Sequence, residues 1–535
     1  MSLMVDETKQ NNRDGLLREV ARRRTFAIIS HPDAGKTTLT EKLLLYTGAV
    51  HLAGAVRTRG TASDWMTMEK QRGISISATA LEMEYKGYRI NLLDTPGHQD
   101  FSEDTYRTLM AVDSAVMVLD SAKGIEPQTE KLFKVCRMRG IPILTFINKM
   151  DHPGRDPLEL LDEVERMLGI AAVPINWPVG EAPDFLGVYN LQSKQVFLFQ
   201  RTEHGSYRAP VQTTGIEDPE LLKVLGENAY RKLVEDSELL SGVGSAFDRA
   251  RYLAGELTPV FFGSALNNFG VEPFLEAILD MAPAPAPRET EQGIIDPASD
   301  TFSGFVFKVQ ANIDPRHRDR MAFMRVCSGH FRKDMTVHHP RLGRDVRLSQ
   351  AFRLFGRERE PIEEAFPGDV IGIISPGLFT IGDTVTTGSP IPFARIPRFP
   401  PEHFGVLVNT DINRYKQFHK GLEQLEEEGA VQVLYATEIN RKEPILAAVG
   451  ELQFDVVLSR LQDEYGVKAR VERLSFTSAR WVKADQVSID KMSLSRSSTR
   501  LCRDRQERLV ILFSSNWALE HTQRENPDVI FVEMG

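Results

Sequence analysis

A glycine-containing loop near the N-terminus is the first segment whose residue types and spacing point to chemistry. Its residues are Ser30, His31, Pro32, Asp33, Ala34, Gly35, Lys36, Thr37 and Thr38. The loop stands between an apolar run and a helix-like segment over residues 39–46, an arrangement that points backbone N–H groups and the positive helix end at phosphates. We expect Lys36 to reach the β- and γ-phosphates of a nucleotide and the Thr37 hydroxyl to ligate Mg²⁺. Ser30 replaces the usual first glycine, and Gly35 still allows the backbone to approach a phosphate closely.

Two further segments have the groups needed to sense a γ-phosphate. One consists of Asp94, Thr95, Pro96, Gly97 and His98, directly after the apolar run at residues 89–93. The Asp94 carboxylate can hold Mg²⁺ through water and the Gly97 N–H can donate to the γ-phosphate; a helix-capping aspartate is the alternative. The other is Arg72-Gly73-Ile74-Ser75, whose Ser75 hydroxyl can complete the Mg²⁺ shell only while a γ-phosphate is present, unless it merely begins a strand. We therefore predict a switch with Thr37, Ser75 and Asp94 as metal ligands.

The segment Asn148-Lys149-Met150-Asp151, again directly after an apolar run, indicates which base is bound. The Asp151 carboxylate can accept hydrogen bonds from guanine N1–H and the 2-amino group, whereas adenine would leave it desolvated and unpaired. A site built on such hydrogen bonds rejects the analogue by about four to five orders of magnitude. Ser264, Ala265 and Leu266 follow the last apolar run, where their N–H groups can meet guanine O6. Taken alone, Asn-Lys-x-Asp is also compatible with a polar surface turn.

The elements that must position these motifs alternate along residues 25–281. Short apolar runs occur at residues 26–29, 89–93, 115–119, 143–147 and 259–263, with helix-like segments between them. This alternation is typical of a mainly parallel sheet covered on both faces. Lys86-Gly87 between two strand-like stretches predicts a hairpin with one antiparallel strand at the sheet edge. Because open α/β sheets bind ligands at the carboxyl ends of their strands, the five motifs together predict a GTP-binding and GTP-hydrolysing switch.

The predicted fold is multidomain α/β with three domains. Residues 1–285 are expected to form a P-loop GTP-binding domain, a mostly parallel sheet with one antiparallel strand, and to carry an insertion near residues 174–259. The Pro/Ala stretch at residues 282–287 marks the first boundary. Short strands with Gly/Pro turns predict a β-barrel over residues 295–395. Helix-like and strand-like segments alternate over residues 398–535, which predicts an α+β domain.

Composition excludes several classes of protein. The chain has 535 residues, of which 41% are hydrophobic and 26% charged, and no apolar run reaches the roughly 18 residues that span a bilayer. The N-terminal residues do not resemble a signal peptide. Three scattered cysteines favour a reduced, cytoplasmic protein. The net charge of −9 argues against a DNA-binding surface, while arginine clusters near residues 22–24, 316–320 and 496–508 leave contact with ribosomal RNA open. We expect a monomer without a membrane partner.

Beyond these motifs, Glu69-Lys70-Gln71-Arg72-Gly73-Ile74 taken together with the Asp94 to His98 segment resembles the translational GTPases, an elongation-factor-like family that works on the ribosome. Gly450-Glu451-Leu452-Gln453-Phe454-Asp455 resembles a segment in the third domain of the translocase branch. The release-factor branch is resembled most closely at residues 30–37, 69–75 and 413–418. Translocases carry additional C-terminal domains, whereas this chain stops soon after its third domain. Ser75 stands where most of the family has threonine, and it keeps the hydroxyl.

The resemblance implies a ribosome-dependent GTPase of translation termination, which promotes dissociation and recycling of class I peptide chain release factors. In this family His98 would orient the attacking water, with the γ-phosphate as the proton acceptor, and Pro32 and Ile74 would gate the histidine. The alternative is another ribosomal GTPase, translocase-like or a ribosome-protection factor; a non-hydrolysing scaffold and an ATP-dependent kinase are disfavoured by His98 and Asp151. Because recognition rests on guanine, ribose and the β-phosphate, we expect guanosine tetraphosphate to compete for the GDP position.

Overall fold

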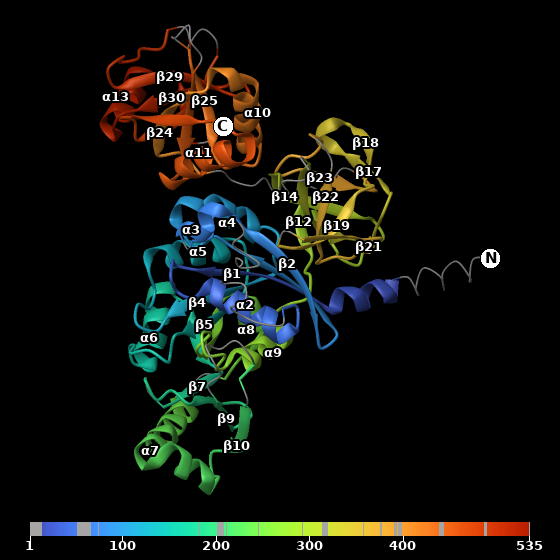
Figure 1. Cartoon of the computed structure of the whole chain (residues 1–535), viewed down its shortest axis with the longest axis vertical. Helices are drawn as coiled ribbons and strands as arrows, with labels where there is room; N and C mark the ends of the chain where they lie inside the picture. Colours follow the sequence, from blue (N-terminus) through green and yellow to red (C-terminus); the bar gives the residue numbers. More distant parts are fainter. Residues whose placement is uncertain are drawn as a thin grey trace, which may run out of the picture.

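Three units follow one another along the chain in the computed structural model (Figure 1). It describes residues 13–533 except 51–65, 73, 181, 201–207, 210, 244–245, 291–292, 313–318, 357, 375–376, 390–392, 394–398, 438–442, 486–488 and 490. Gly73 and the arginines at 316 and 318 therefore lie outside the described residues. The first unit occupies the middle and bottom of the view, a barrel lies to its right, and a third unit sits on top.

A mixed sheet forms the centre of the first unit. Its strands run in the order β2-β3-β1-β4-β5-β11-β6, and all except β2 are parallel to their neighbours. Their bounds are β1 Arg23–Ser30, β2 Thr79–Tyr85, β3 Tyr88–Asp94, β4 Ser114–Asp120, β5 Ile143–Asn148, β6 Ala171–Pro174 and β11 Leu257–Phe262. Strands β1, β4, β5 and β11 are buried throughout, as their unbroken apolar runs predicted for a sheet covered on both faces.

Helices cover both faces of this sheet. One apolar core contains residues of α2 and α9, and the other contains residues of α4, α5 and α6. Their bounds are α2 Lys36–Thr47, α4 Ser102–Leu109, α5 Pro127–Met138, α6 Pro157–Leu168 and α9 Val271–Met281, with the short α3 Thr67–Arg72 and the 3₁₀ turn η1 Gln99–Phe101 outside these two layers. The two-sided packing leaves the carboxyl ends of the strands as the place where loops gather.

The antiparallel strand β2 joins the first unit to the barrel. Lys86 and Gly87 both have positive φ, 48° and 81°, and close the predicted hairpin between β2 and β3. The sequence predicted that this strand ends the sheet. In the structure it also pairs with β19 (Ala351–Phe355), where Leu81 lies opposite Phe355. The barrel thus uses the backbone groups that an edge strand leaves unpaired, a contact between distant segments that local patterns do not encode.

The insertion forms a subdomain at the bottom of Figure 1. Four antiparallel strands lie in the order β10-β9-β8-β7, and the long helix α7 packs beside them. Their bounds are β7 Asn176–Val179, β8 Gly187–Asn190, β9 Gln195–Phe199, β10 Val211–Gly215, α7 Pro219–Val243 and the separate α8 Arg249–Leu253. Gly226 interrupts the helical conformation of α7 with a φ of 74°. The predicted strand pair and helix are present, and β7 and β10 complete the sheet.

The second unit is an antiparallel barrel. A short hairpin of β12 Arg288–Thr290 and β13 Gly293–Ile295 leads into it. Its strands are β14 Ser303–Ala311, β15 Arg320–Ser328, β16 Phe331–Arg332, β17 Thr336–His339, β18 Arg344–Arg347, β19, β20 Glu358–Pro361, β21 Glu364–Ala365, β22 Val370–Ile374 and β23 Thr384–Thr386. Alternate side chains of these strands fill one apolar core.

The third unit is an eight-stranded antiparallel sheet with helices. The strands run in the order β27-β24-β26-β25-β29-β30-β28-β31. The bounds are β24 His403–Asn409, α10 Tyr415–Glu427, β25 Gln432–Ala436, β26 Pro444–Ala448, α11 Leu452–Tyr465, β27 Ala469–Leu474, β28 Ser478–Lys483, β29 Thr499–Asp504, β30 Leu509–Phe513, α13 Asn516–Glu525 and β31 Ile530–Val532. Helices α10 and α11 share one core with the first half of the sheet, and the final strand β31 pairs with β28.

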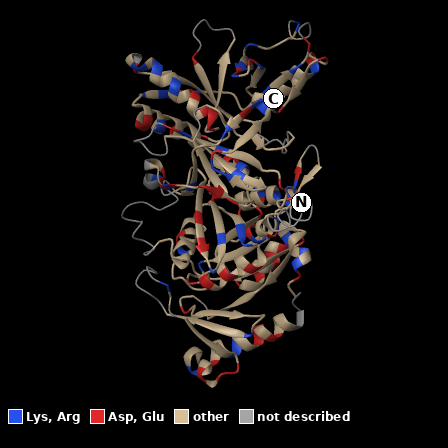
Figure 2. Ribbon diagram, turned by 90° about the vertical axis from the view of Figure 1, so that its right-hand side faces the viewer, with Lys and Arg blue, Asp and Glu red and all other residues tan. Residues whose placement is uncertain are grey.

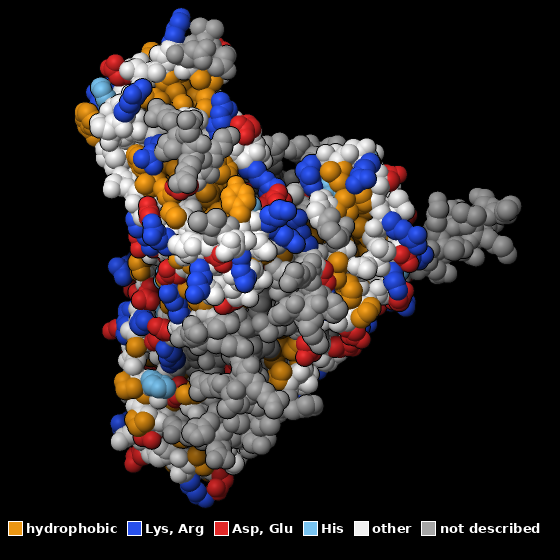
Figure 3. Space-filling view, turned by 45° about the horizontal axis from the view of Figure 1, so that its top comes forward, with side chains coloured by type: hydrophobic (Ala, Val, Ile, Leu, Met, Phe, Trp, Pro, Cys, Tyr) orange, Lys and Arg blue, Asp and Glu red, His pale blue; other side chains and the backbone are white. Residues whose placement is uncertain are grey.

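Charge is mixed over all three units, which agrees with a modest net charge. Lysine and arginine alternate with aspartate and glutamate along the ribbon (Figure 2). On the face shown in Figure 3, acidic and basic side chains are likewise mixed, and hydrophobic side chains gather over the upper part of the view. Among the described residues, no helix is both long and apolar enough to cross a membrane.

Candidate nucleotide-binding site

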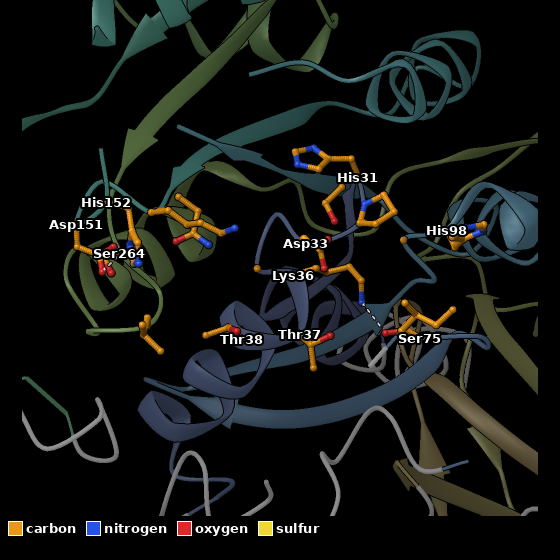
Figure 4. Close-up of a pocket in the computed structure, with 18 residues that line it drawn as sticks. His31, Asp33, Lys36, Thr37, Thr38, Ser75, His98, Asp151, His152 and Ser264 are labelled. Atoms are coloured by element: carbon orange, nitrogen blue, oxygen red, sulfur yellow. Dashed lines mark hydrogen bonds and ion pairs between the residues drawn. The ribbon is translucent and has the colours of Figure 1, made fainter. Parts of the chain in front are cut away.

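A cavity of about 560 Å³ opens at the carboxyl ends of β1, β3, β5 and β11 (Figure 4). All five sequence motifs contribute to its wall. The lining residues are Ser30, His31, Pro32, Asp33, Gly35, Lys36, Thr37, Thr38, Ile74, Ser75, Gly97, His98, Asn148, Lys149, Asp151, His152, Ser264 and Leu266. The fold therefore brings together segments that are up to about 230 residues apart in the chain, as expected for ligands bound outside the carboxyl ends of sheet strands.

The phosphate-binding loop has a backbone that only glycine fits at one point. Gly35 has a φ of 94°, and a Cβ there would overlap the side-chain amide nitrogen of Asn148. That amide donates to the Ala34 carbonyl at 2.8 Å, while its oxygen accepts from the Ala265 N–H at 2.9 Å. Asn148 thus ties the loop to the turn after β11. Ala34 and Ala265 contribute through their backbones and do not line the cavity.

One end of the cavity presents an unsatisfied carboxylate oxygen. The Asp151 side chain is only 5% exposed, and its Oδ2 accepts from Asn267 Nδ2 at 2.9 Å and lies 3.1 Å from His152 Nδ1. Its Oδ1 is buried and has no hydrogen-bond partner within the described part of the chain. A buried acceptor without a donor is costly, so this oxygen fits a ligand that supplies N–H groups. The N1–H and 2-amino groups of guanine are such donors.

Lysine and carboxylate meet at the opposite end. Lys36 Nζ lies 2.5 Å from Asp94 Oδ1 and 3.3 Å from Ser75 Oγ, a contact drawn as a dashed line in Figure 4. Both charged side chains are almost fully buried. The ammonium group therefore stands between oxygens that can also ligate a divalent cation. Thr37, the second residue of α2, lines the same end of the cavity.

His98 occupies the margin of this second end. Its Nδ1 accepts a hydrogen bond from the Asp100 N–H at 3.2 Å and lies at the same distance from Asp100 Oδ1. A neutral ring that accepts at Nδ1 carries its hydrogen on Nε2, and a protonated ring carries one there as well. The Nε2–H is consequently available as a donor in both protonation states. Nearby, Gly97 lies against the backbone of His31 and Pro32.

Three further predicted residues make contacts within the protein, and of these three only His31 also lines the cavity. The His31 side chain is buried between Thr129 and Glu126, and burial lowers the pKa of its imidazole. Thr95 is fully buried and its hydroxyl donates to the Ile28 carbonyl, while the Pro96 carbonyl accepts from Thr105. Neither Thr95 nor Pro96 lines the cavity.

Sequence reasoning did not single out three residues that shape the guanine end. These are Asp120, His152 and Asn267. Asp120 ends β4 and pairs with Lys149 at 2.7 Å, and hydrogen bonds from Lys149 and the Ala122 N–H outweigh its burial and lower the pKa of its carboxyl. Asn267 follows Ser264-Ala265-Leu266 directly, so its place in the chain was the available signal.

Metal ligation at this site would depend on hydroxyls and one carboxylate. Among the described residues, no group of three or more His, Cys, Asp or Glu side chains could hold a metal ion. Thr37, Ser75 and Asp94, which the sequence predicts as ligands, would supply only oxygen donors. Mg²⁺ is usually bound in this way, through few protein ligands together with substrate phosphates and water.

Comparison with known proteins covers nearly the whole chain. Residues 21–284 match the elongation factor Tu GTP binding domain, residues 301–388 match elongation factor G domain 2, and residues 393–523 match the class II release factor RF3 C-terminal domain. Peptide chain release factor 3 from Gloeobacter violaceus is 56% identical over 97% of this chain and 98% of its own length. The same factor from Symbiobacterium thermophilum is 53% identical, with 97% and 98% covered. A crystal structure of a Thermus thermophilus protein has a TM-score of 0.70 at 25% identity, covering 87% of this chain and 71% of that one.

Proposed function

This chain belongs to the peptide chain release factor 3 family and is a translational GTPase, and from that premise we propose that it acts on the ribosome at termination. In this proposal it hydrolyses GTP when stimulated by the ribosome and promotes departure and recycling of class I release factors. The preference for guanine is supported by one observation. Asp151 Oδ1 is buried without a hydrogen-bond donor at one end of the cavity, and Lys36 lies at the other end.

Binding of GTP would redistribute the charged groups at the phosphate end. Lys36, now paired with Asp94, has a side chain that can turn to the β- and γ-phosphates. Thr37, Ser75 and Asp94 would then hold Mg²⁺, which neutralises charge on the phosphates when bound. Because Ser75 belongs to a loop rather than to the sheet, it is the ligand whose position depends on the γ-phosphate.

His98 would position the attacking water in this scheme. Its Nε2–H donates to the water oxygen, which directs the hydrogens of the water toward the γ-phosphate. The water oxygen forms a bond to the γ-phosphorus, the bond to the β–γ bridging oxygen breaks, and a proton passes to a γ-phosphate oxygen. The histidine does not have to accept a proton, because its free nitrogen already carries one. Pro32 and Ile74, which line the cavity, would gate its approach.

The role of His98 is tested by replacing it with alanine. We expect His98→Ala to lower ribosome-stimulated GTP hydrolysis by at least about 10²-fold, the usual cost of losing the group that positions a reactant, with GTP affinity nearly unchanged. Single-turnover hydrolysis with and without ribosomes, together with nucleotide titration, measures both quantities. His338→Ala, on the barrel surface, is the matched control. Undiminished stimulated hydrolysis in His98→Ala would contradict the assignment.

The alternative, another ribosomal GTPase, makes a different prediction about the stage of translation. In the proposed role, GTP and this protein accelerate dissociation of a labelled class I release factor from ribosomes that have already released their peptide. A translocase-like factor would instead advance messenger and transfer RNA on the ribosome. The match of residues 393–523 to the class II release factor domain supports the first outcome.

We also propose a nucleotide that inhibits the protein, and a cellular location and oligomeric state for it. Guanosine tetraphosphate would occupy the GDP position through its guanine and β-phosphate and, without a γ-phosphate, would hold the inactive state. A titration in which it fails to displace labelled GDP would dismiss this idea. The protein would work as a cytoplasmic monomer on ribosomes rather than on DNA, which the net charge of −9 supports.

A further inference from the structure

The third unit reaches the neighbourhood of His98 through the start of α11. The N–H of Leu452, the first residue of that helix, donates to Asp100 Oδ2 at 2.8 Å. Asp100 belongs to η1, two residues after His98, and is 8% exposed. A hydrogen bond between segments 352 residues apart therefore lies beside the residue proposed to position water.

Asp100 faces His98 with its other groups. Its Oδ1 lies 3.2 Å from His98 Nδ1, and its backbone N–H donates to the same nitrogen. One carboxylate thus contacts the histidine ring through one oxygen and the third unit through the other. These two contacts fix the orientation of the carboxylate, since rotation of the Asp100 side chain would leave the Leu452 N–H without an acceptor.

The third unit is shaped to receive this carboxylate. A Cβ at Gly450 would overlap Asp100, and the three atoms nearest to it all belong to the Asp100 side chain. The φ of Gly450 is not in the left-handed region, so the position of Asp100, and not the backbone conformation, is what excludes a larger residue here. Glu451, between the two contact residues, instead points to His403 and Arg473.

An apolar cluster adjoins the contact. Phe101 of η1 packs with Val456 and Leu452 of α11 and with Met66, Met68, Ile74 and Ile76 around the Ser75 loop. Hydrogen bonds with little access to water are stronger and more sensitive to geometry than exposed ones. Both segments that bear on the γ-phosphate therefore meet the third unit at one place.

We propose that Asp100 is a positioning residue for GTP hydrolysis, through which the Gly450–Leu452 turn of the third unit sets the ring of His98. While the Leu452 N–H holds Oδ2, Asp100 is fixed so that its backbone N–H donates to Nδ1, and Nε2 is directed away from it. If the third unit shifts, the carboxylate loses its donor and the ring loses its support. The inference depends on the proposed role of His98.

Four variants test this proposal through kcat and KM of ribosome-stimulated hydrolysis. Asp100→Ala removes both contacts of the carboxylate, so that nothing fixes the backbone N–H that donates to Nδ1, and Gly450→Ala displaces the carboxylate from the side of the third unit. Both should lower kcat by about ten- to a hundredfold, as misplacement of a positioned group does, with KM for GTP unchanged. Asp100→Asn should retain most activity, because the amide oxygen can accept from the Leu452 N–H while the backbone N–H still donates to Nδ1. Glu451→Gln, in the same turn, should match the wild type.

The values of kcat and nucleotide affinity in these variants distinguish a positioning role of Asp100 from a structural one. A selective loss of kcat in Asp100→Ala and Gly450→Ala, rescued in Asp100→Asn, supports the proposal. A kcat within twofold of wild type in Asp100→Ala, or equal losses in kcat and GDP affinity in all Asp100 variants, overturns it in favour of a structural role. His98→Ala is assayed in parallel. If it hydrolyses normally, the role of His98 fails; if it is inactive while Asp100→Ala is active, only the present inference fails.

Discussion

The two ends of the nucleotide cavity are held in place by different parts of the molecule. At the guanine end, Asn148 bonds to the backbones of Ala34 and Ala265, and Asn267 donates to Asp151. All of these hydrogen bonds lie within the first unit. At the γ-phosphate end, the loop that carries Ser75 and the turn that carries His98 are both held by residues from other units. Lys308 of the barrel donates to Ser77 Oγ at 2.5 Å and to the Ala78 carbonyl, and Leu452 of the third unit holds Asp100.

Because of this difference, recognition of the base and detection of the γ-phosphate would depend on different parts of the molecule. In the proposed function, a guanine end built from local hydrogen bonds would recognise the base whether GTP or GDP is bound. The γ-phosphate end can change only together with the barrel and the third unit, so the presence of a γ-phosphate can be passed to distant surfaces. The buried carboxylate of Glu69 supports this interpretation. It accepts hydrogen bonds from the N–H groups of Met66, Ile76 and Ser77 and so links the described residues on both sides of Ser75.

The largest effect expected from this comparison is at Asp151. In Asp151→Asn, an amide can present a donor to the N–H groups of guanine, so we expect GTP and GDP affinity to fall equally, by about four orders of magnitude. Xanthosine diphosphate, whose 2-carbonyl accepts from the new amide, should bind better than GDP. Calorimetric titration measures all three nucleotides, and Asp162→Asn on the exposed face of α6 is the control. A loss confined to GTP would break the separation of the two ends.

The guanine end was also the part most accessible from sequence. Asn148, Asp151 and the Ser264 turn each follow a continuous apolar strand, and parallel strands bring their carboxyl ends to one edge. Repetition of that local signal predicted the first unit and its site. The barrel and the helices of the third unit were likewise visible in their turns and periodicity.

The supports of the γ-phosphate end were not predictable in this way. Lys308 lies in a strand whose sequence shows only that it is buried, and Asp100 looks like an ordinary residue at a helix start. Their roles depend on how the barrel and the third unit dock, which is decided by contacts between residues hundreds of positions apart. Strand β28 was not predicted either, since it pairs with β30 and β31, which lie about 30–50 residues further along the chain.

Lys308 provides the next largest test, now at the γ-phosphate end. Its buried amine has a pKa lowered by burial, and it still donates to Ser77 and to the Ala78 carbonyl. In Lys308→Met the buried Ala78 carbonyl and the partly buried Ser77 hydroxyl lose their donor, at a cost of about 1–3 kcal/mol. We expect the ratio of GTP to GDP affinity to fall about tenfold, with GDP affinity itself little changed. Titration with GDP and a non-hydrolysable GTP analogue gives the ratio.

A surface lysine of the same barrel serves as the control for that substitution. Lys333 pairs with Glu363 on an exposed face, so Lys333→Met should leave the ratio as it is. If Lys308→Met instead weakens GDP and GTP alike, the barrel supports the whole cavity rather than its γ-phosphate end, and the two ends are not separable.

The smallest expected effect concerns Asn267, which lies beyond the guanine motifs but donates to Asp151 Oδ2 at 2.9 Å. Asn267→Ala removes one hydrogen bond that orients the carboxylate, worth about 1 kcal/mol, so GDP and GTP affinity should each fall about fivefold. The ratio between them should not move, and discrimination against ATP should weaken, because a loosened Asp151 accepts less well from guanine. Nucleotide titrations measure these values, with Asn228→Ala on the exposed surface of α7 as the control. A change in the GTP to GDP ratio would mean that Asn267 senses the γ-phosphate across the cavity, and the guanine end would then belong to the switch.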